Sequence, residues 1–181
     1  MQELQHKLME YLRPDVTRVE LGRKASLLDQ GEVSRKLHFV EAGCLRLYYV
    51  DEEGEDVTLF FFMEGEMVAS FESFLNAEAS EFGIEAVVPT VVQVVEKESV
   101  FKALDENPEF RNLTFDILIS RLASYQRLFL NTIRFSPQKR YEELVKSNPK
   151  LFETVPQHYI ASYLGVTPVS LSRIRKKYER R

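Results

Sequence analysis

The sequence predicts an α+β fold: an N-terminal antiparallel β-roll of the jelly-roll kind, a long helix, and a C-terminal helical domain containing a helix-turn-helix. Three observations support this prediction. Glycines separate short apolar runs between residues 16 and 95, an apolar helical pattern continues from residue 107 to about 135, and residues 157–176 contain two short helical patterns around a glycine. We therefore expect a β-roll over residues 1–106, a dimerisation helix over 107–135 and a helix-turn-helix domain over 136–181.

The N-terminal region begins with one helix and then changes to short strands. Leucines at four-residue intervals predict a helix over residues 1–12, which Pro14 ends. Over residues 16–95, apolar runs alternate with turn residues, as in an antiparallel sandwich or barrel. The turns contain glycines nine to twelve residues apart: Gly22, Gly31, Gly43, Gly54 and Gly65. Residues 51–56 (DEEGED) are predicted as a hairpin tip, and residues 67–75 as a short helix between strands.

The long helix is apolar on more than one side. Five of its apolar residues follow the 3-4-3-4 spacing of a coiled-coil seam: Phe115, Leu118, Leu122, Tyr125 and Phe129. Further apolar residues lie off this seam: Leu113, Ile117, Ile119, Leu128, Leu130 and Ile133. A helix of this kind must be covered on several sides, so we expect one face to pack on the β-roll and another on a second copy of the chain. Burial of both faces within one chain is the alternative.

The C-terminal region is predicted to be helical throughout. Ser136-Pro137 begins a helix that Asn148-Pro149 ends. In the next helix, Ile160 and Leu164 share one face, and Gly165 can adopt the left-handed conformation that ends it. Thr167 is the predicted N-cap of the last helix and Pro168 its first residue. The buried stripe of this last helix is predicted to be Leu171, Ile174 and Tyr178. An ordinary pair of helices with no binding role is the alternative.

The outward face of the last helix is polar and basic, which suits the DNA major groove. The predicted base contacts are Val169, Ser170 and Arg173, with Arg173 positioned to contact a guanine. The predicted phosphate contacts are Thr167, Arg175, Lys176, Lys177, Arg180 and Arg181. Although the net charge of the chain is −4, residues 134–181 contain eleven Lys and Arg against four Asp and Glu. The charge asymmetry therefore also indicates that double-stranded DNA binds at the C-terminal end.

The order of these parts resembles the Crp/Fnr family of bacterial transcription regulators. Residues 27–68 look like the core of the family's cyclic-nucleotide-binding-type β-roll, and residues 160–177 look like its DNA-reading motif. The resemblance implies a homodimer that joins through the long helix and binds a two-fold symmetric DNA site. It also makes RNA polymerase a candidate partner.

The ligand pocket departs from the family pattern. In cyclic-nucleotide-binding members, a Gly-Glu pair precedes a short helix and an Arg-Ser pair, and the arginine neutralises the cyclic phosphate. Gly65-Glu66 matches the first pair, but Ser80-Glu81 falls where the second is expected, and no Lys or Arg occurs in residues 64–96. A buried phosphate needs a charge-assisted partner. Binding of cyclic AMP by the usual mechanism is therefore not expected, and the cofactor stays unknown.

The sequence contains few residues that could serve another kind of sensor or another function. The single cysteine, Cys44, excludes internal disulfides and an iron-sulfur sensor that needs several cysteines, and it is expected to be a buried small residue. Haem would need ligands from His6, His38, His158 or Cys44, and His38 is expected to be a core histidine with satisfied nitrogens.

A metal-dependent jelly-roll enzyme needs two or three histidines inside the barrel, where only His38 is available. A module that binds protein instead of DNA is a further alternative. Of these functions we expect a DNA-binding regulator and not an enzyme.

The composition is that of a globular protein without a membrane segment. Of the 181 residues, 44% are hydrophobic and 29% are charged, which excludes a disordered chain. No apolar run reaches the length of about 18 residues that a membrane span needs. Acidic residues near the start of the chain argue against a secretory signal. A cytoplasmic protein with no membrane partner is therefore expected.

Overall fold

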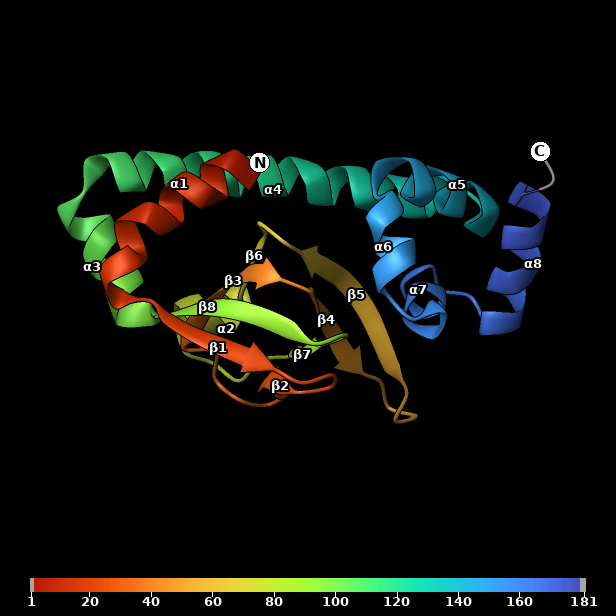
Figure 1. The fold of residues 1–181 in the computed structure, drawn as a ribbon, viewed down its shortest axis with the longest axis horizontal. Helices are drawn as coiled ribbons and strands as arrows, with labels where there is room; N and C mark the ends of the chain where they lie inside the picture. Colours follow the sequence, from red (N-terminus) through yellow and green to blue (C-terminus); the bar gives the residue numbers. More distant parts are fainter. Residues whose placement is uncertain (1, 180–181) are drawn as a thin grey trace.

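The computed structural model describes residues 2–179 and has an elongated shape (Figure 1). The helix α4 (Pro108–Arg134) runs along one side of the molecule. The helices α1 and α3 lie at its start, the β-strands lie beneath the rest of it, and the C-terminal helices gather at its far end. The long helix thus connects the β-roll to the helix-turn-helix domain, as the sequence predicts.

The β-roll consists of two four-stranded antiparallel sheets. The first sheet has the order β1 (Thr17–Leu21), β8 (Thr90–Glu96), β3 (Lys36–Ala42) and β6 (Met67–Val68). The second has the order β2 (Ser26–Leu28), β7 (Gly83–Ala86), β4 (Cys44–Val50) and β5 (Asp56–Met63). Apolar side chains from both sheets form one buried cluster that includes Val40, Leu45, Val68, Ile84, Ala86 and Val92. The predicted antiparallel β-roll is confirmed.

The hairpin between β4 and β5 forms where the sequence DEEGED predicts it. Gly54 has a φ of +84°, a conformation that costs a side-chain-bearing residue energy. The Asp51 carboxylate accepts hydrogen bonds from the backbone amides of Glu53 and Glu55, at 3.1 and 2.9 Å. The turn is therefore fixed by local contacts that the sequence encodes.

The predicted helix over residues 67–75 is partly wrong. Met67 and Val68 form the short strand β6, which pairs with Phe39 and His38 of β3. The helix α2 (Phe71–Asn76) begins only after this strand. Both β6 side chains are buried, so pairing with β3 stabilises an extended conformation that the local pattern does not reveal.

Helices at the N-terminus and after β8 cover one end of the β-roll. The helix α1 (Gln2–Leu12) is followed by a 3-10 turn, η1 (Arg13–Asp15), that contains Pro14. The helix α3 (Lys97–Glu106) follows β8 directly, and Asn107 then caps α4 by accepting bonds from the amides of Glu109 and Phe110. Buried side chains of α1, α3 and α4 join a cluster with the sheet residues Leu37 and Phe39. This end of α4 is therefore fixed to the β-roll.

The C-terminal domain contains one helix more than the sequence predicts. The helix α5 (Pro137–Ser147) begins and ends as expected, but a short helix, α6 (Pro149–Thr154), follows it. The helices α7 (Gln157–Tyr163) and α8 (Pro168–Glu179) form the helix-turn-helix. One buried cluster joins all four helices and includes Tyr141, Leu151, Ile160, Leu164 and Leu171.

Candidate nucleic-acid interface

The corner between α7 and α8 has the conformation that the sequence predicts. Gly165 has a φ of +63° and its amide donates to the Ser162 carbonyl at 2.9 Å. The Val166 amide donates to the Ala161 carbonyl at 3.0 Å, so the end of α7 is satisfied before the chain turns. Ala161 is fully buried, which allows the two helices to approach each other closely.

Thr167 caps the first turn of α8. Its hydroxyl oxygen accepts a hydrogen bond from the Ser170 amide at 3.2 Å and lies 3.0 Å from the Ser170 hydroxyl. Thr167 is exposed and Ser170 is half-buried. Both side chains are therefore engaged in the cap, although each stays at the surface where a DNA backbone could reach it.

The outward face of α8 lies opposite its buried stripe. Leu171 is buried, and Ile174 and Tyr178 pack against the same cluster. At about 100° per residue, Val169, Ser172, Arg173 and Lys176 occupy the opposite arc. All four are exposed, and Val169 is 62% exposed. Ser172 was missed by the sequence reasoning, although helical spacing alone could have placed it on this face.

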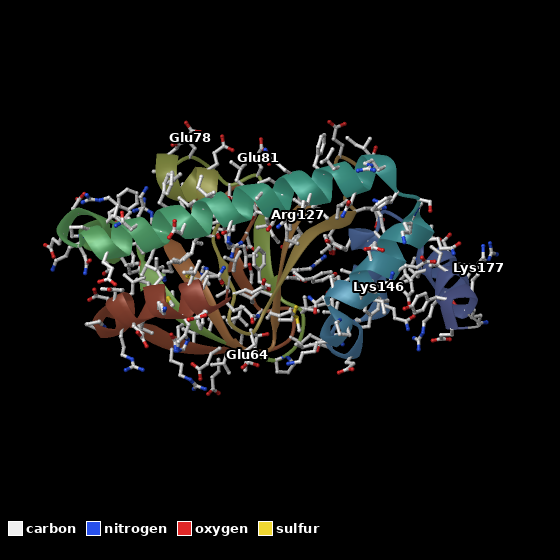
Figure 2. The ribbon with its side chains drawn as sticks, turned by 90° about the horizontal axis from the view of Figure 1, so that it is seen from above. Glu64, Glu78, Glu81, Arg127, Lys146 and Lys177 are labelled. Carbon is white, nitrogen blue, oxygen red and sulfur yellow. The ribbon has the colours of Figure 1, made fainter. Side chains whose placement is uncertain are left out.

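The predicted phosphate contacts differ in their surroundings. Lys176 and Lys177 are exposed and have no ion pair with any residue that the structure describes. Figure 2 shows Lys177 at the end of the molecule formed by α8, far from the strands. Arg175 instead donates through Nε to Glu179 at 2.7 Å, beside the buried stripe. The predicted contacts Arg180 and Arg181 lie outside the described residues.

The side of α4 opposite its buried residue Ile117 is apolar and uncovered. It exposes eight large apolar side chains: Phe115, Leu118, Ile119, Leu122, Tyr125, Phe129, Leu130 and Ile133. At about 100° per residue these span roughly 140° of the helix surface, centred on Phe115, Leu122 and Ile133. We call this surface the α4 apolar face.

All five predicted seam residues lie on the α4 apolar face, but two of them also have neighbours within the chain. The Tyr125 ring lies 4.9 Å from the ring of Phe60 in β5, and Tyr125 is only 36% exposed. Leu118 lines a small apolar cavity of about 130 Å³ within the same chain. Tyr125 therefore lies at one edge of the α4 apolar face. Ile119 and Ile133, which the sequence reasoning placed off the seam, are 50% and 67% exposed on the same face, and Ile133 lies near its centre.

The four predicted pocket residues do not come together. Gly65 and Glu66 form the turn between β5 and β6, where the Glu66 carboxylate accepts from the Met63 amide at 2.7 Å. Ser80 and Glu81 line other surface cavities, none of which includes that turn. Figure 2 shows Glu64, next to this turn, and Glu81 on opposite sides of α4. This separation corrects the predicted shared pocket.

Serine side chains occupy the position where the resemblance places the phosphate-binding arginine of cyclic-nucleotide-binding members. The Ser80 hydroxyl donates to Ser70 at 2.8 Å or to the Phe82 carbonyl at 2.7 Å, and it accepts from the Phe82 amide at 3.0 Å. Ser70 directly precedes α2, and both serines are buried. Glu81 beside them is exposed. This group can donate neutral hydrogen bonds but supplies no positive charge.

Arg121 of α4 is the cation that reaches the β-roll beneath the helix. Its guanidinium donates to the Met67 carbonyl and lies 5.5 Å from the ring of Phe62. Burial raises the pKa of the nearby Glu66, and the charge of Arg121 opposes that effect. Arg121 is thus already used to attach α4 to β5 and β6.

A buried arginine joins the β-roll to the helix-turn-helix. The Arg46 side chain in β4 makes two hydrogen bonds with Asp56, at 2.8 and 2.9 Å, and one with Glu85 at 2.8 Å. Its guanidinium stacks between the rings of Tyr48 and Tyr159, at 4.4 and 4.2 Å. Arg46 holds the pKa of the Asp56 carboxyl below its usual value. We call Arg46, Asp56, Glu85 and Tyr159 the domain junction.

Further bonds fix α7 against β5 at this junction. The Tyr159 hydroxyl lies 3.3 Å from Glu85 Oε1, and the Thr58 amide donates to the Ser162 hydroxyl oxygen at 2.9 Å. The Tyr163 ring lies 5.5 Å from that of Phe61. The sequence reasoning missed the junction, because its charges come from segments far apart in the chain.

His38 and Cys44 are both buried in the β-roll. Burial lowers the pKa of His38 to about 4, and neither ring nitrogen meets hydrogen-bond geometry with another described residue. The expectation of a core histidine is therefore confirmed, but the expectation that its nitrogens are satisfied is not. The Val68 backbone opposes part of the pKa shift. Burial raises the pKa of the Cys44 thiol to about 12. Cys44 is thus held as a thiol, consistent with a packing role.

Neither a membrane-spanning helix nor a cluster of metal ligands occurs among the described residues. No helix between residues 2 and 179 has the length and hydropathy that crossing a membrane requires. Over the same residues, no three side chains of His, Cys, Asp or Glu are grouped as metal ligands.

Comparisons with known proteins identify the β-roll and the fold. The model of the cyclic nucleotide-binding domain matches residues 18–107. No curated protein sequence matches the chain significantly. Among solved structures, FixK2 from Bradyrhizobium japonicum is similar with a TM-score of 0.77 and 16% identity, over 91% of this chain and 85% of that one.

Two further solved structures agree with this result. The c-di-GMP-responsive global regulator CLP from Xanthomonas campestris has a TM-score of 0.75 and 15% identity, over 97% of this chain and 92% of that one. A transcriptional regulator of the Crp/Fnr family from Eubacterium rectale has a TM-score of 0.72 and 16% identity, over 96% and 82%. Residues 18–107 therefore match the cyclic nucleotide-binding domain, and the chain shares the fold of solved transcription regulators, among them one of the Crp/Fnr family.

Proposed function

We propose that this protein is a homodimeric transcription regulator that reads a two-fold symmetric DNA site with α8. The observation that carries the proposal is the outward face of α8, where Val169, Ser172, Arg173 and Lys176 are exposed on a capped helix. A helix of this kind fits the major groove, and arginine can bond to two acceptors of guanine. The likeness to solved regulators supports the same function.

The α4 apolar face supports the dimer. Monomeric proteins seldom expose a continuous apolar surface of this extent, and such a surface usually marks an interface. Pairing two copies of α4 along Phe115, Leu122 and Ile133 removes these side chains from water and places two α8 helices in one particle. A two-fold symmetric protein then requires a two-fold symmetric DNA site.

The β-roll does not offer the charged phosphate contact of cyclic-nucleotide-binding members. Ser70 and Ser80 bond to each other where a cation is needed, and Glu81 adds negative charge. We therefore expect no response to cyclic AMP by the arginine mechanism. The β-roll either binds a ligand of different charge or serves as a fixed support for the DNA-binding domain.

Selection of bound sequences from a random DNA pool tests the proposal. The purified protein is incubated with the pool in the presence and absence of a small-molecule extract, and bound DNA is sequenced. A consensus of two inverted half-sites is expected, while a consensus that changes with the extract would identify the β-roll as a sensor. Arg173→Ala serves as the matched variant, and equal enrichment by both proteins, or no enrichment by either, contradicts the proposal.

A further inference from the structure

The side chain at the centre of the outward face of α8 is apolar. Val169 is 62% exposed. The buried stripe of the helix consists of Leu171, Ile174 and Tyr178, and at about 100° per residue Val169 points almost directly away from it. Figure 1 shows α8 at the end of the molecule, away from the strands, so the β-roll does not cover this face. Val169 is therefore open to a duplex that lies against α8.

Packing within the chain does not account for this valine. Among residues 2–179, Val169 joins none of the three buried apolar clusters. A β-branched residue also has a lower helix propensity than alanine. Isolated apolar residues are common on protein surfaces, but the other members of this arc, Ser172, Arg173 and Lys176, are polar or charged. The contact of Val169 is therefore expected to lie outside the chain.

The first turn of α8 offers few polar atoms beside Val169. The Thr167 hydroxyl oxygen lies 3.2 Å from the amide nitrogen and 3.0 Å from the hydroxyl oxygen of Ser170, which is half-buried. Pro168 is exposed and has no amide hydrogen to donate. Beyond the cap, the exposed surface of this turn therefore consists mainly of the carbon atoms of Pro168 and Val169.

One group in the major groove suits such a surface. The edges of the base pairs present hydrogen-bond donors and acceptors there, together with the C5-methyl group of thymine. An apolar side chain that covers a donor or an acceptor removes it from water without replacing its hydrogen bond, which weakens binding. A valine against the thymine methyl group loses no hydrogen bond and buries apolar surface on both sides.

Arg173 lies one helical turn after Val169 on the same face. Four residues of an α-helix rise by about 6 Å, which is close to two base-pair steps of 3.4 Å. The guanidinium of Arg173 is exposed and can bond to two acceptors of guanine. The two side chains therefore reach base pairs that are neighbours or nearly so.

We infer that Val169 recognises a thymine through its 5-methyl group, one or two base pairs from the guanine that Arg173 contacts. The inference rests on the proposed function and deepens it, because it names a base of the half-site and the group by which that base is read. Valine has neither a donor nor an acceptor, so the recognition depends on the methyl group alone.

The test removes this methyl group from the DNA. In the site selected by the wild type, each thymine within two base pairs of the guanine read by Arg173 is replaced by deoxyuridine, which lacks only the 5-methyl group. Affinity is measured by fluorescence anisotropy for the wild type and for Val169→Ala, which shortens the side chain and adds no polar atom. A second pair of duplexes carries cytosine or 5-methylcytosine at the same position.

The wild type is expected to lose about fourfold in affinity at one thymine position when one half-site is substituted, and about sixteenfold when both are, because burial of one methyl-sized group contributes about fourfold. It should prefer 5-methylcytosine to cytosine by the same factor. For Val169→Ala both ratios should fall below about twofold, as in a double-mutant cycle between one side chain and one methyl group.

The matched control is Lys176→Ala, which changes another exposed residue of the same arc. It should weaken binding to all duplexes alike and keep the fourfold effect of the methyl group. Equal affinity of the wild type for thymine and deoxyuridine at every position tested overturns the inference. So does a fourfold effect that persists in Val169→Ala, or a selected site with no thymine within two base pairs of that guanine.

Failure of the inference can be distinguished from failure of the proposed function. A wild type that selects inverted half-sites but shows no methyl dependence refutes the role of Val169 and leaves the regulator proposal intact. A wild type that enriches no sequence refutes the proposed function, and the inference then fails with it.

Discussion

The guanidinium carbon of Arg46 in β4 lies 4.2 Å from the centroid of the Tyr159 ring in α7. The Arg46 side chain is only 2% exposed, and its carboxylate partners Asp56 and Glu85 are 48% and 13% exposed. One residue of the helix-turn-helix domain thus closes a charged cluster that belongs to the β-roll. This contact, together with the Thr58–Ser162 hydrogen bond, therefore helps to fix the relative orientation of the two domains.

Replacing Arg46 by leucine is expected to lower the free energy of unfolding by about 3 kcal/mol, because it leaves a largely buried carboxylate without its partner. Tyr159→Phe removes only the hydroxyl contact with Glu85 and should cost about 1 kcal/mol. Urea denaturation measures both changes. Arg18→Leu breaks exposed ion pairs and serves as the control, with an expected cost under about 1 kcal/mol. Equal losses in all three variants would show that the junction has no special role.

The order of secondary-structure elements could be predicted because each depends on local signals. Asn107-Pro108 and Ser136-Pro137 mark helix starts at which the side chains of Asn107 and Ser136 do cap the backbone. The six-residue helix α6 was missed because it is too short to show a helical period. The strand β6 was missed because pairing with β3, not local preference, determines its conformation.

The residues of the candidate interface could be predicted only where they lie close together in the sequence. Gly165, Thr167 and Arg173 follow from spacing along two adjacent helices. The contact between Tyr125 of α4 and Phe60 of β5 could not be predicted, because it joins two elements that are far apart in the sequence.

Arg173→Ala is expected to weaken binding to the selected DNA site by about 1–3 kcal/mol and to relax preference at one base position. The reason is that the exposed guanidinium is the side chain on α8 best able to bond to two acceptors of one base. Affinities for single-base variants of the site measure the effect. Arg175→Ala is the matched control on the same helix, because Arg175 is paired with Glu179 beside the buried stripe. An equal loss for Arg173→Ala on every sequence would refute base reading.

Lys177→Ala is expected to weaken binding to all DNA sequences alike and to make the salt slope shallower by about one per protomer. Lys177 is exposed, unpaired within residues 2–179, and lies at the edge of the outward face of α8. Titrations at several salt concentrations test this. Lys102→Ala, at the far end of the molecule, should leave the slope unchanged. If Lys177→Ala has the same salt slope as the wild type, Lys177 does not contact a phosphate.

Leu122→Glu is expected to convert the proposed dimer into a monomer, because it places a charge at the centre of the α4 apolar face. Sedimentation over a range of protein concentrations measures the association. Arg127→Glu introduces the same residue elsewhere on α4, where Figure 2 shows the arginine side chain, and should leave the dimer intact. If Leu122→Glu sediments like the wild type, the two copies do not join through this face.

His38 is expected to make the protein less stable as the pH falls from about 6.5 to about 4. Burial lowers its pKa to about 4 in the folded state, so over this range the unfolded chain binds a proton that the folded chain does not. The loss amounts to at most about 3 kcal/mol. In the His38→Leu variant the free energy of unfolding should vary less with pH, as urea denaturation at pH 7, 6 and 5 would measure. His6→Gln removes an exposed histidine and should keep the wild-type dependence. Parallel pH profiles for His38→Leu and the wild type would mean that His38 is protonated equally in both states.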